Sequence, residues 1–187
     1  FRDYVYDQYW TRDRYVETIN GIDSMVNNVD RNIQVGSAYS QYDLQQKFSW
    51  RINSTILQTL NIQHSNSSNI NRYDRLTDTI ANGNLRFAEW YYGPQFRLMG
   101  ILNTKILKET KLMTHANISL AAQKVTQERV NRRYRQDTRT SQLEQVLVYS
   151  LNADFMKAWE EKGELFYGLE IVMNDVRSQA NTYDIAL

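Results

Sequence analysis

The sequence predicts an all-β protein, an antiparallel meander of about six strands. Two observations favour this class. Apolar and polar residues alternate with a period of two over several stretches, which is typical of strands whose two faces meet different surroundings. The links between these stretches also differ in length: some are short and polar, while others run for many residues. Short turns at one rim and long loops at the other are typical of outer-membrane β-barrels.

The expected strands can be justified in order along the chain. Tyr42, Leu44, Phe48 and Trp50 alternate with polar residues, and in 112–122 the even positions carry most of the apolar residues. From Leu143 to Phe155 almost every odd position is apolar, and the same holds from Leu165 to Met173. Two further stretches alternate more weakly. The expected strands are 42–52, 56–65, 96–107, 112–124, 141–157 and 164–177, paired in sequence order.

The links complete this prediction. Short links are expected at 52–55, 108–111 and 160–163. Long loops are expected at 66–95 and 124–140, and a long stretch, 1–40, precedes the first strand. Each strand should also have two unlike faces. Tyr149, Leu151, Leu165, Tyr167, Leu169 and Ile171 are expected on the lipid side, and Glu144, Asn152, Asp154 and Glu170 on the lumen side.

Other architectures stay open at this point. Leu143, Val146, Leu147, Leu151, Phe155 and Trp159 also fit one stripe of a helix, and the chain has only one Pro. A helical interaction module is therefore one alternative. A soluble β-sandwich, which would bury the same alternating residues between two sheets, is another.

Composition argues against several function classes. A net charge of +1 gives no overall field for nucleic acid. With no Cys, the chain has no disulfide, thiolate zinc site or thiol nucleophile. His64 and His115 stand far apart without a metal-ligand pattern, and no phosphate loop, nucleophile elbow or zinc-protease motif is present. We expect no enzyme activity, no metal and no cofactor. The mean hydropathy of −0.63 does not decide between soluble and membrane proteins, because barrels have polar interiors.

Several motifs resemble one family. They are Tyr6-Asp-Gln-Tyr-Trp-Thr-Arg12, Gln45-Gln-Lys-Phe-Ser-Trp50, Asn71-Arg-Tyr-Asp-Arg-Leu-Thr77, Gly83-Asn-Leu-Arg-Phe-Ala-Glu-Trp-Tyr-Tyr-Gly-Pro-Gln95, Glu164-Leu-Phe-Tyr-Gly-Leu-Glu170 and Asn174-Asp-Val-Arg-Ser178. In this order they resemble TonB-dependent receptors of Gram-negative bacteria, over nearly the whole chain. The loop motif around 71–77 is the most specific of them.

The resemblance implies a large barrel of about 22 strands in the cell outer membrane. In this family a plug domain closes the barrel and is pulled by TonB. Residues 1–187 would then be a partial transmembrane β-barrel domain without its plug, because six strands cannot close so large a barrel. The implied function is import of a scarce nutrient such as an iron chelate, haem, cobalamin or a glycan. The implied partners are the remaining strands, the plug, TonB through the plug, outer-membrane lipid and lipopolysaccharide.

Candidate site residues follow from side-chain chemistry. Aromatic rings suit the membrane–water boundary, so we expect an aromatic girdle near the short turns, made of Trp50, Phe155, Trp159 and Tyr167. Rings beside Arg can grip an anionic ligand or a glycan, or can simply pack loop on loop. The candidates for ligand binding are Arg72, Tyr73, Arg75, Arg86, Trp90, Tyr91 and Tyr92. The basic stretch 129–139 is expected to be a solvated outer loop facing lipopolysaccharide phosphates.

Overall fold

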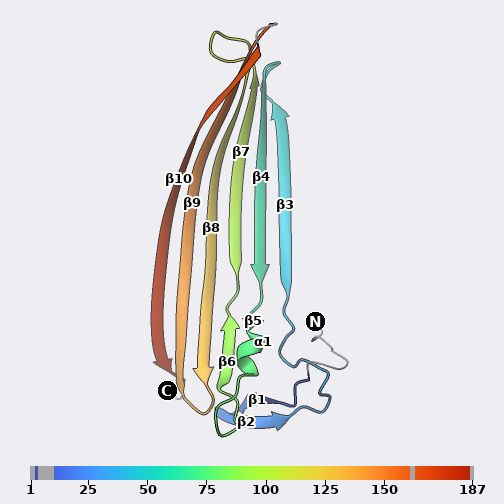
Figure 1. The fold of residues 1–187 in the computed structure, drawn as a ribbon, viewed down its shortest axis with the longest axis vertical. Coiled ribbons are helices and arrows are strands. Elements are labelled where there is room, and N and C mark those ends of the chain that lie inside the picture. Colours follow the sequence, from blue (N-terminus) through green and yellow to red (C-terminus); the bar gives the residue numbers. More distant parts are fainter. Residues whose placement is uncertain (1–2, 4–10, 161–162, 186–187) are drawn as a thin grey trace.

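Six long antiparallel strands lie side by side and form the body of the molecule (Figure 1). The computed structural model describes residues 3, 11–160 and 163–185. The long strands are β3 (Gln41–Arg51), β4 (Ile56–Ser67), β7 (Phe96–Leu107), β8 (His115–Arg133), β9 (Thr138–Trp159) and β10 (Gly163–Asp184). They lie in the order β10-β9-β8-β7-β4-β3, so sequence neighbours are also sheet neighbours. The predicted all-β class and antiparallel meander are confirmed, and the helical alternative is wrong.

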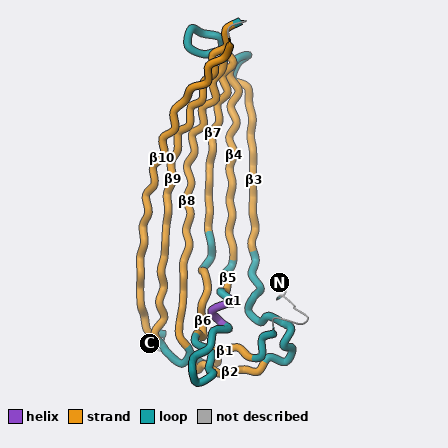
Figure 2. Tube along the Cα trace, viewed as in Figure 1, coloured by secondary structure: helices purple, strands orange, loops and turns teal. Residues whose placement is uncertain are grey.

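The shorter elements gather at one end of the sheet, away from the three short links (Figure 2). They are β1 (Arg14–Ile19), β2 (Ile22–Asn27), β5 (Ile70–Asn71), α1 (Tyr73–Leu76) and β6 (Phe87–Tyr92). β1 and β2 form a separate hairpin, β5 pairs with β6, and β6 pairs with β8. The described parts of 1–40 and 66–95, expected as long loops, therefore carry secondary structure of their own.

The prediction of a long loop at 124–140 is wrong. β8 continues to Arg133, β9 begins at Thr138, and the two pair without a break up to Arg132 opposite Arg139. The turn between them has only the four residues 134–137. The charged strand ends are held in register because β6 pairs alongside β8 and because acidic side chains from β2 and β6 bond to Arg132 and Arg139.

The strand register gives the six-stranded sheet two unlike faces. Directly opposed residues of an antiparallel pair point to the same side, so the pairing can be followed from strand to strand. One side, the apolar face, carries Leu44, Phe48, Trp50, Leu60, Ile62, Leu98, Leu102, Ile118, Leu120, Tyr149, Leu151, Phe155, Leu165, Tyr167, Leu169, Ile171 and Met173. The other side, the polar face, carries Lys47, Ser49, Asn61, Gln63, Asn103, Lys105, Asn117, Ser119, Gln123, Glu144, Asn152, Asp154 and Glu170, with apolar exceptions such as Val148 and Phe166. The two residue sets predicted for opposite sides do lie on opposite faces.

Little of the apolar face is covered by the described chain. Side chains on it stay widely exposed: Leu44 at 63%, Leu169 at 56% and Met173 at 66%. The buried apolar residues are few: Leu76, Leu85, Ala116, Val130 and Ala153. The sheet is open, with β3 and β10 at its two edges. In the described residues no helix is long and apolar enough to cross a membrane.

Candidate functional site

The exposed apolar side chains form a band of limited height, here called the apolar band. On β10 it runs from Leu165 to Met173, and on β9 from Leu147 to Phe155. Nine residues of a strand span about 27 Å, at about 3.4 Å per residue. The next residues on the same face of β10 are Asp175 and Arg177, which are ion-paired at 3.0 Å. Charge therefore limits the band on the side away from the short links.

A charge also lies at this level on β8, two strands away from β10. Lys124 of β8 lies opposite Leu147, which in turn lies opposite Asp175. At this level the apolar face carries charge on β8 and β10, while on β9 Leu147 is followed along the same face by the polar residue Gln145.

The opposite limit of the band lies at the short links, where the predicted girdle residues are found. Trp50, Phe155, Trp159 and Tyr167 all belong to the apolar face by register. The rings of Phe155 and Tyr167 stack with centroids 5.2 Å apart. The Tyr167 hydroxyl donates to the carbonyl of Leu112, in the link after β7, at 2.8 Å. Its ring therefore meets the band while its polar tip meets the rim, but its role as a girdle residue stays a prediction.

A buried lysine stem marks the same rim. Lys157 is 7% exposed, yet its Nζ reaches Glu109 Oε1 at 3.2 Å and the Thr110 carbonyl at 2.8 Å. The aliphatic part of a lysine can cover apolar surface while its charged end finds polar partners at the edge. Lys157 therefore ends the apolar face without leaving an unpaired charge inside it.

The polar face carries hydrogen-bonded amides and hydroxyls. The Asn103 amide donates to Asn117 Oδ1 and to Ser119 Oγ, both at 2.8 Å. The Gln45 amide donates to Asn61 at 3.2 Å. A hollow of about 850 Å³ lies over this face near the short links, and Lys47 and Lys105 are among its lining residues. Such a surface suits water or a polar partner, in contrast to the apolar band on the other side.

The predicted ligand-binding residues do not form one group. Arg72, Trp90 and Tyr92 come together: the Arg72 guanidinium lies 5.1 Å from the Trp90 ring centroid, and its Nη1 donates to the Tyr92 hydroxyl at 3.2 Å. Trp90 and Tyr92 also meet edge to face at 5.4 Å. Because the Arg72 guanidinium is already held by Tyr92 and by both carboxylate oxygens of Asp74, the contacts favour the packing interpretation for this part of the prediction.

The other candidates lie apart from that cluster. Tyr73 faces Arg12, while Arg75 and Arg86 are paired with Asp74 at 3.8 Å and Asp78 at 3.1 Å. The short helix α1 contains Tyr73, Asp74 and Arg75, and Asp74 pairs there with Arg72 and Arg75. Tyr91 is on the other side of β6 from Trp90, and burial raises the pKa of its hydroxyl. Tyr91 lines a cavity at this end of the sheet.

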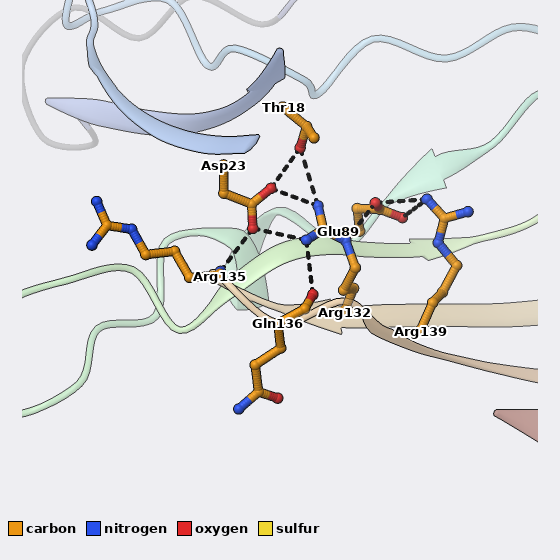
Figure 3. Close-up of polar contacts among 7 residues, drawn as sticks. All are labelled: Thr18, Asp23, Glu89, Arg132, Arg135, Gln136 and Arg139. Carbon is orange, nitrogen blue, oxygen red and sulfur yellow. Dashed lines mark hydrogen bonds and ion pairs between the residues drawn. The ribbon is translucent and has the colours of Figure 1, made fainter. Parts of the chain in front are cut away.

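The strongest polar network was not predicted from the sequence (Figure 3). Arg132 is 1% exposed, and its two terminal nitrogens donate to both carboxylate oxygens of Asp23, at 2.7 and 2.8 Å. Its Nε donates to Glu89 at 2.8 Å, and Glu89 also accepts from Arg139 at 2.7 Å. Thr18 and the backbone N–H of Arg135 complete the environment of Asp23. The network joins β2, β6, β8 and β9.

The electrostatics of this network favour its charged form. Burial alone would raise the pKa of Asp23, but hydrogen bonds from Arg132, Thr18 and the Arg135 backbone overcome that effect and lower it. The same balance lowers the pKa of Glu89, where Arg139 and Arg132 donate. The hydrogen bond with Asp23 raises the pKa of Arg132. All four side chains thus remain ionised at neutral pH.

This network corrects the expectation for the basic stretch 129–139. Arg132 and Arg139 are held by carboxylates inside the protein, and Arg129 lies 3.6 Å from Glu144. Arg132 and Arg139 are therefore engaged within the chain, whereas Arg129 stays exposed beside Glu144. Within the expected outer loop, only the four residues 134–137 lie outside the strands, and they form a turn.

Comparisons with protein-family models, with curated proteins and with solved structures find no match to this chain. The described residues also contain no group of three or more His, Asp or Glu side chains placed to hold a metal ion. The geometry itself therefore carries the functional argument. It offers two surfaces: the apolar band, and the polar end of the sheet where the N-terminal segment packs.

Proposed function

We propose that this chain forms part of the wall of a β-barrel in the cell outer membrane, with the apolar band against lipid and the polar face toward the lumen. The observation that carries the proposal is an exposed apolar band on a sheet whose other face is polar. Soluble proteins rarely expose continuous apolar patches larger than a few hundred Å². A barrel wall needs this pattern, since one face of every strand meets lipid.

The dimensions of the band support the same proposal. A strand crosses the hydrocarbon core with about 9–11 residues when it is tilted. The stretch from Leu165 to Met173 has that length, and the charged pair Asp175–Arg177 follows it directly. At the other limit stand Trp159, Tyr167 and the stem of Lys157, whose apolar bodies and polar ends suit the membrane–water boundary.

Within this class, we propose a TonB-dependent receptor that imports a scarce nutrient. The support is the resemblance of the motifs around Asn71–Thr77 and Gly83–Gln95, of which the first holds α1 and the second holds β6. The partners would be further barrel strands beside β3 and β10, a plug against the polar face, TonB acting through that plug, and the lipid and lipopolysaccharide of the outer membrane. Transport through a barrel requires no catalytic residue of the chain.

A spin-label scan tests the proposed function. The chain has no Cys, so single cysteines can be placed at each position from Leu165 to Met173 and labelled one at a time. The full chain, reconstituted in phospholipid vesicles, should show oxygen access at odd positions and access to a water-soluble nickel complex at even ones. Oxygen is concentrated in lipid, whereas the nickel complex stays in water.

The competing arrangement, a second sheet packed on the apolar face, gives a different result in the same scan. Odd positions would then be shielded from both oxygen and the nickel complex. A period of two with oxygen access at positions such as Leu169 and Ile171 supports the barrel. Loss of oxygen access at those positions contradicts it.

A further inference from the structure

A cavity of about 600 Å³ lies at the polar end of the sheet, between the N-terminal segment and β6. Its lining includes Arg12, Tyr15, Glu89, Trp90, Tyr91 and Arg139. The volume is in the usual range for small-molecule sites, about 300–1,000 Å³. The lining combines aromatic rings with two guanidinium groups, so it has both apolar and cationic character.

Arg12 is the most deeply buried cation of the lining. The residue is only 5% exposed, and its guanidinium faces the rings of Tyr73 and Tyr15, with centroids at 5.3 and 5.9 Å. Its Nη1 donates to the carbonyl of Val35. Its backbone N–H donates to the carbonyl of Arg31 at 2.8 Å. The rings and these bonds fix the orientation of the side chain.

One edge of this guanidinium has no acceptor. The Arg12 Nε is buried and, among the described residues, donates to nothing. The ion pairs found within 4 Å in that part of the chain include none to Arg12. Asp3 contributes a favourable field, but its carboxylate accepts from the backbone N–H groups of Gly36 and Ala38. Burial accordingly lowers the pKa of Arg12, as expected for an incompletely compensated cation.

A second guanidinium group of the lining supports the same conclusion. Arg139 Nε is also buried without an acceptor among the described residues. Glu89, the acidic residue of the lining, is bonded to both Arg139 and Arg132 and so is not available to Arg12. The Nε side of a guanidinium presents two parallel N–H donors that match the two oxygens of a carboxylate. Buried polar groups normally find a partner, and an anion would supply one here.

We propose that this cavity binds a small organic carboxylate, with Arg12 holding the carboxylate group and the rings of Tyr15 and Tyr91 contacting the body of the ligand. The proposal goes beyond the barrel function. It concerns only the polar end of the sheet and does not depend on what covers the apolar band.

Isothermal titration of the full chain in detergent micelles tests the site. The probes are benzoate and benzamide, which share a ring and a size but differ in charge. Benzoate should bind saturably and at least tenfold more tightly than benzamide, since only benzoate compensates the buried cation. Equal affinities, or no saturable benzoate binding, would overturn the proposal, whatever the outcome of the lipid experiments.

Variants then assign the binding to Arg12. R12K keeps the charge but loses the paired donors, so benzoate affinity should fall at least tenfold, and R12Q should abolish binding. R31Q is the matched control, because Arg31 is an exposed residue of the same segment whose side chain pairs with Asp13. It should bind benzoate as the unchanged chain does. Undiminished benzoate binding by R12Q, or inorganic phosphate binding as tightly as benzoate to the unchanged chain, would contradict the assignment.

Discussion

Arg132 and Asp23 form a two-pronged ion pair, at 2.7 and 2.8 Å, between side chains that are each 1% exposed. They stand 109 positions apart in the sequence. The pair attaches the β1–β2 hairpin to the turn end of β8 and β9, and Glu89 extends it to β6. The packing of the N-terminal segment on the sheet therefore depends on a few buried charges more than on an apolar core.

Removing one charge should release the hairpin. D23N leaves Arg132 buried without its main anionic partner, and breaking a buried pair in this way costs about 3–5 kcal/mol. Hydrogen exchange should speed up in β1 and β2 while amides within the apolar band keep their protection. D13N is the control, since the Asp13–Arg31 pair is exposed and should be worth at most about 1 kcal/mol. Unchanged protection of β1 and β2 in D23N would contradict this role.

Acid should have the same effect as D23N. The pKa values of Asp23 and Glu89 are lowered in the folded chain, so their stabilisation is present above the ordinary carboxyl range of about 3.9–4.3 and is lost as pH falls through the lowered values. The distance between spin labels at Asn27 and Arg133 should stay constant from pH 7 to about pH 5, and its distribution should broaden below about pH 4. A distance that changes near pH 6 would point to another titrating group.

Two glycines in the sheet should respond in opposite ways to alanine. A Cβ on Gly168 would meet the Ala153 carbonyl oxygen at 2.7 Å, whereas a Cβ on Gly100 would enter open space. G168A should therefore destabilise the β9–β10 pair by about 1–3 kcal/mol. G100A should be neutral or stabilising by up to about 1 kcal/mol, because it reduces the freedom of the unfolded chain. Urea unfolding of both variants in the same detergent measures the difference, and equal midpoints would contradict the close approach at Gly168.

The position of the six strands could be predicted because alternation is strong inside the apolar band. The strand expected at 96–107 is found as Phe96–Leu107, and the others differ mainly where strands run beyond the band. Past Lys124 the alternation fades, and β8 continues because β9 and β6 pair with it and because distant residues bond to its charged end. Asp23 and Arg132 carry no sign in the sequence that they will meet. Residues 134–137 therefore form a short turn where the sequence predicts a long loop.

The β1–β2 hairpin has a local signal in the sequence, the dipeptide Asn20-Gly21. Asn20 and Gly21 both have positive φ, 50° and 78°, and connect two strands of six residues. Asn-Gly between such strands is the strongest short-range hairpin signal, because both residues tolerate the left-handed conformation that the turn requires. The candidate site was harder to predict. Spacing along β6 could place Trp90 beside Tyr92, but it could not bring Arg12 to Tyr73.

The barrel proposal predicts unequal costs for arginine on the two faces. Leu169 lies on the apolar face and Asn152 on the polar face. L169R should cost about 2–4 kcal/mol near the bilayer midplane, and N152R much less because its side chain stays in water. Folding titrations into vesicles measure both variants. Similar folding costs for L169R and N152R would mean that the two faces have similar surroundings, and they would contradict the barrel proposal.

Quenching of tryptophan by brominated lipids tests the central claim most directly. Trp50 and Trp159 lie on the apolar face at the short-link rim, and Trp90 lies in β6 beyond the band. Chains that keep one of these three, with Phe at the other Trp positions, should be compared in vesicles with bromines near the headgroup end of the acyl chains. If the apolar band faces lipid, Trp50 and Trp159 should be strongly quenched and Trp90 should be quenched little. Equal, weak quenching of all three would mean that the apolar band does not face lipid.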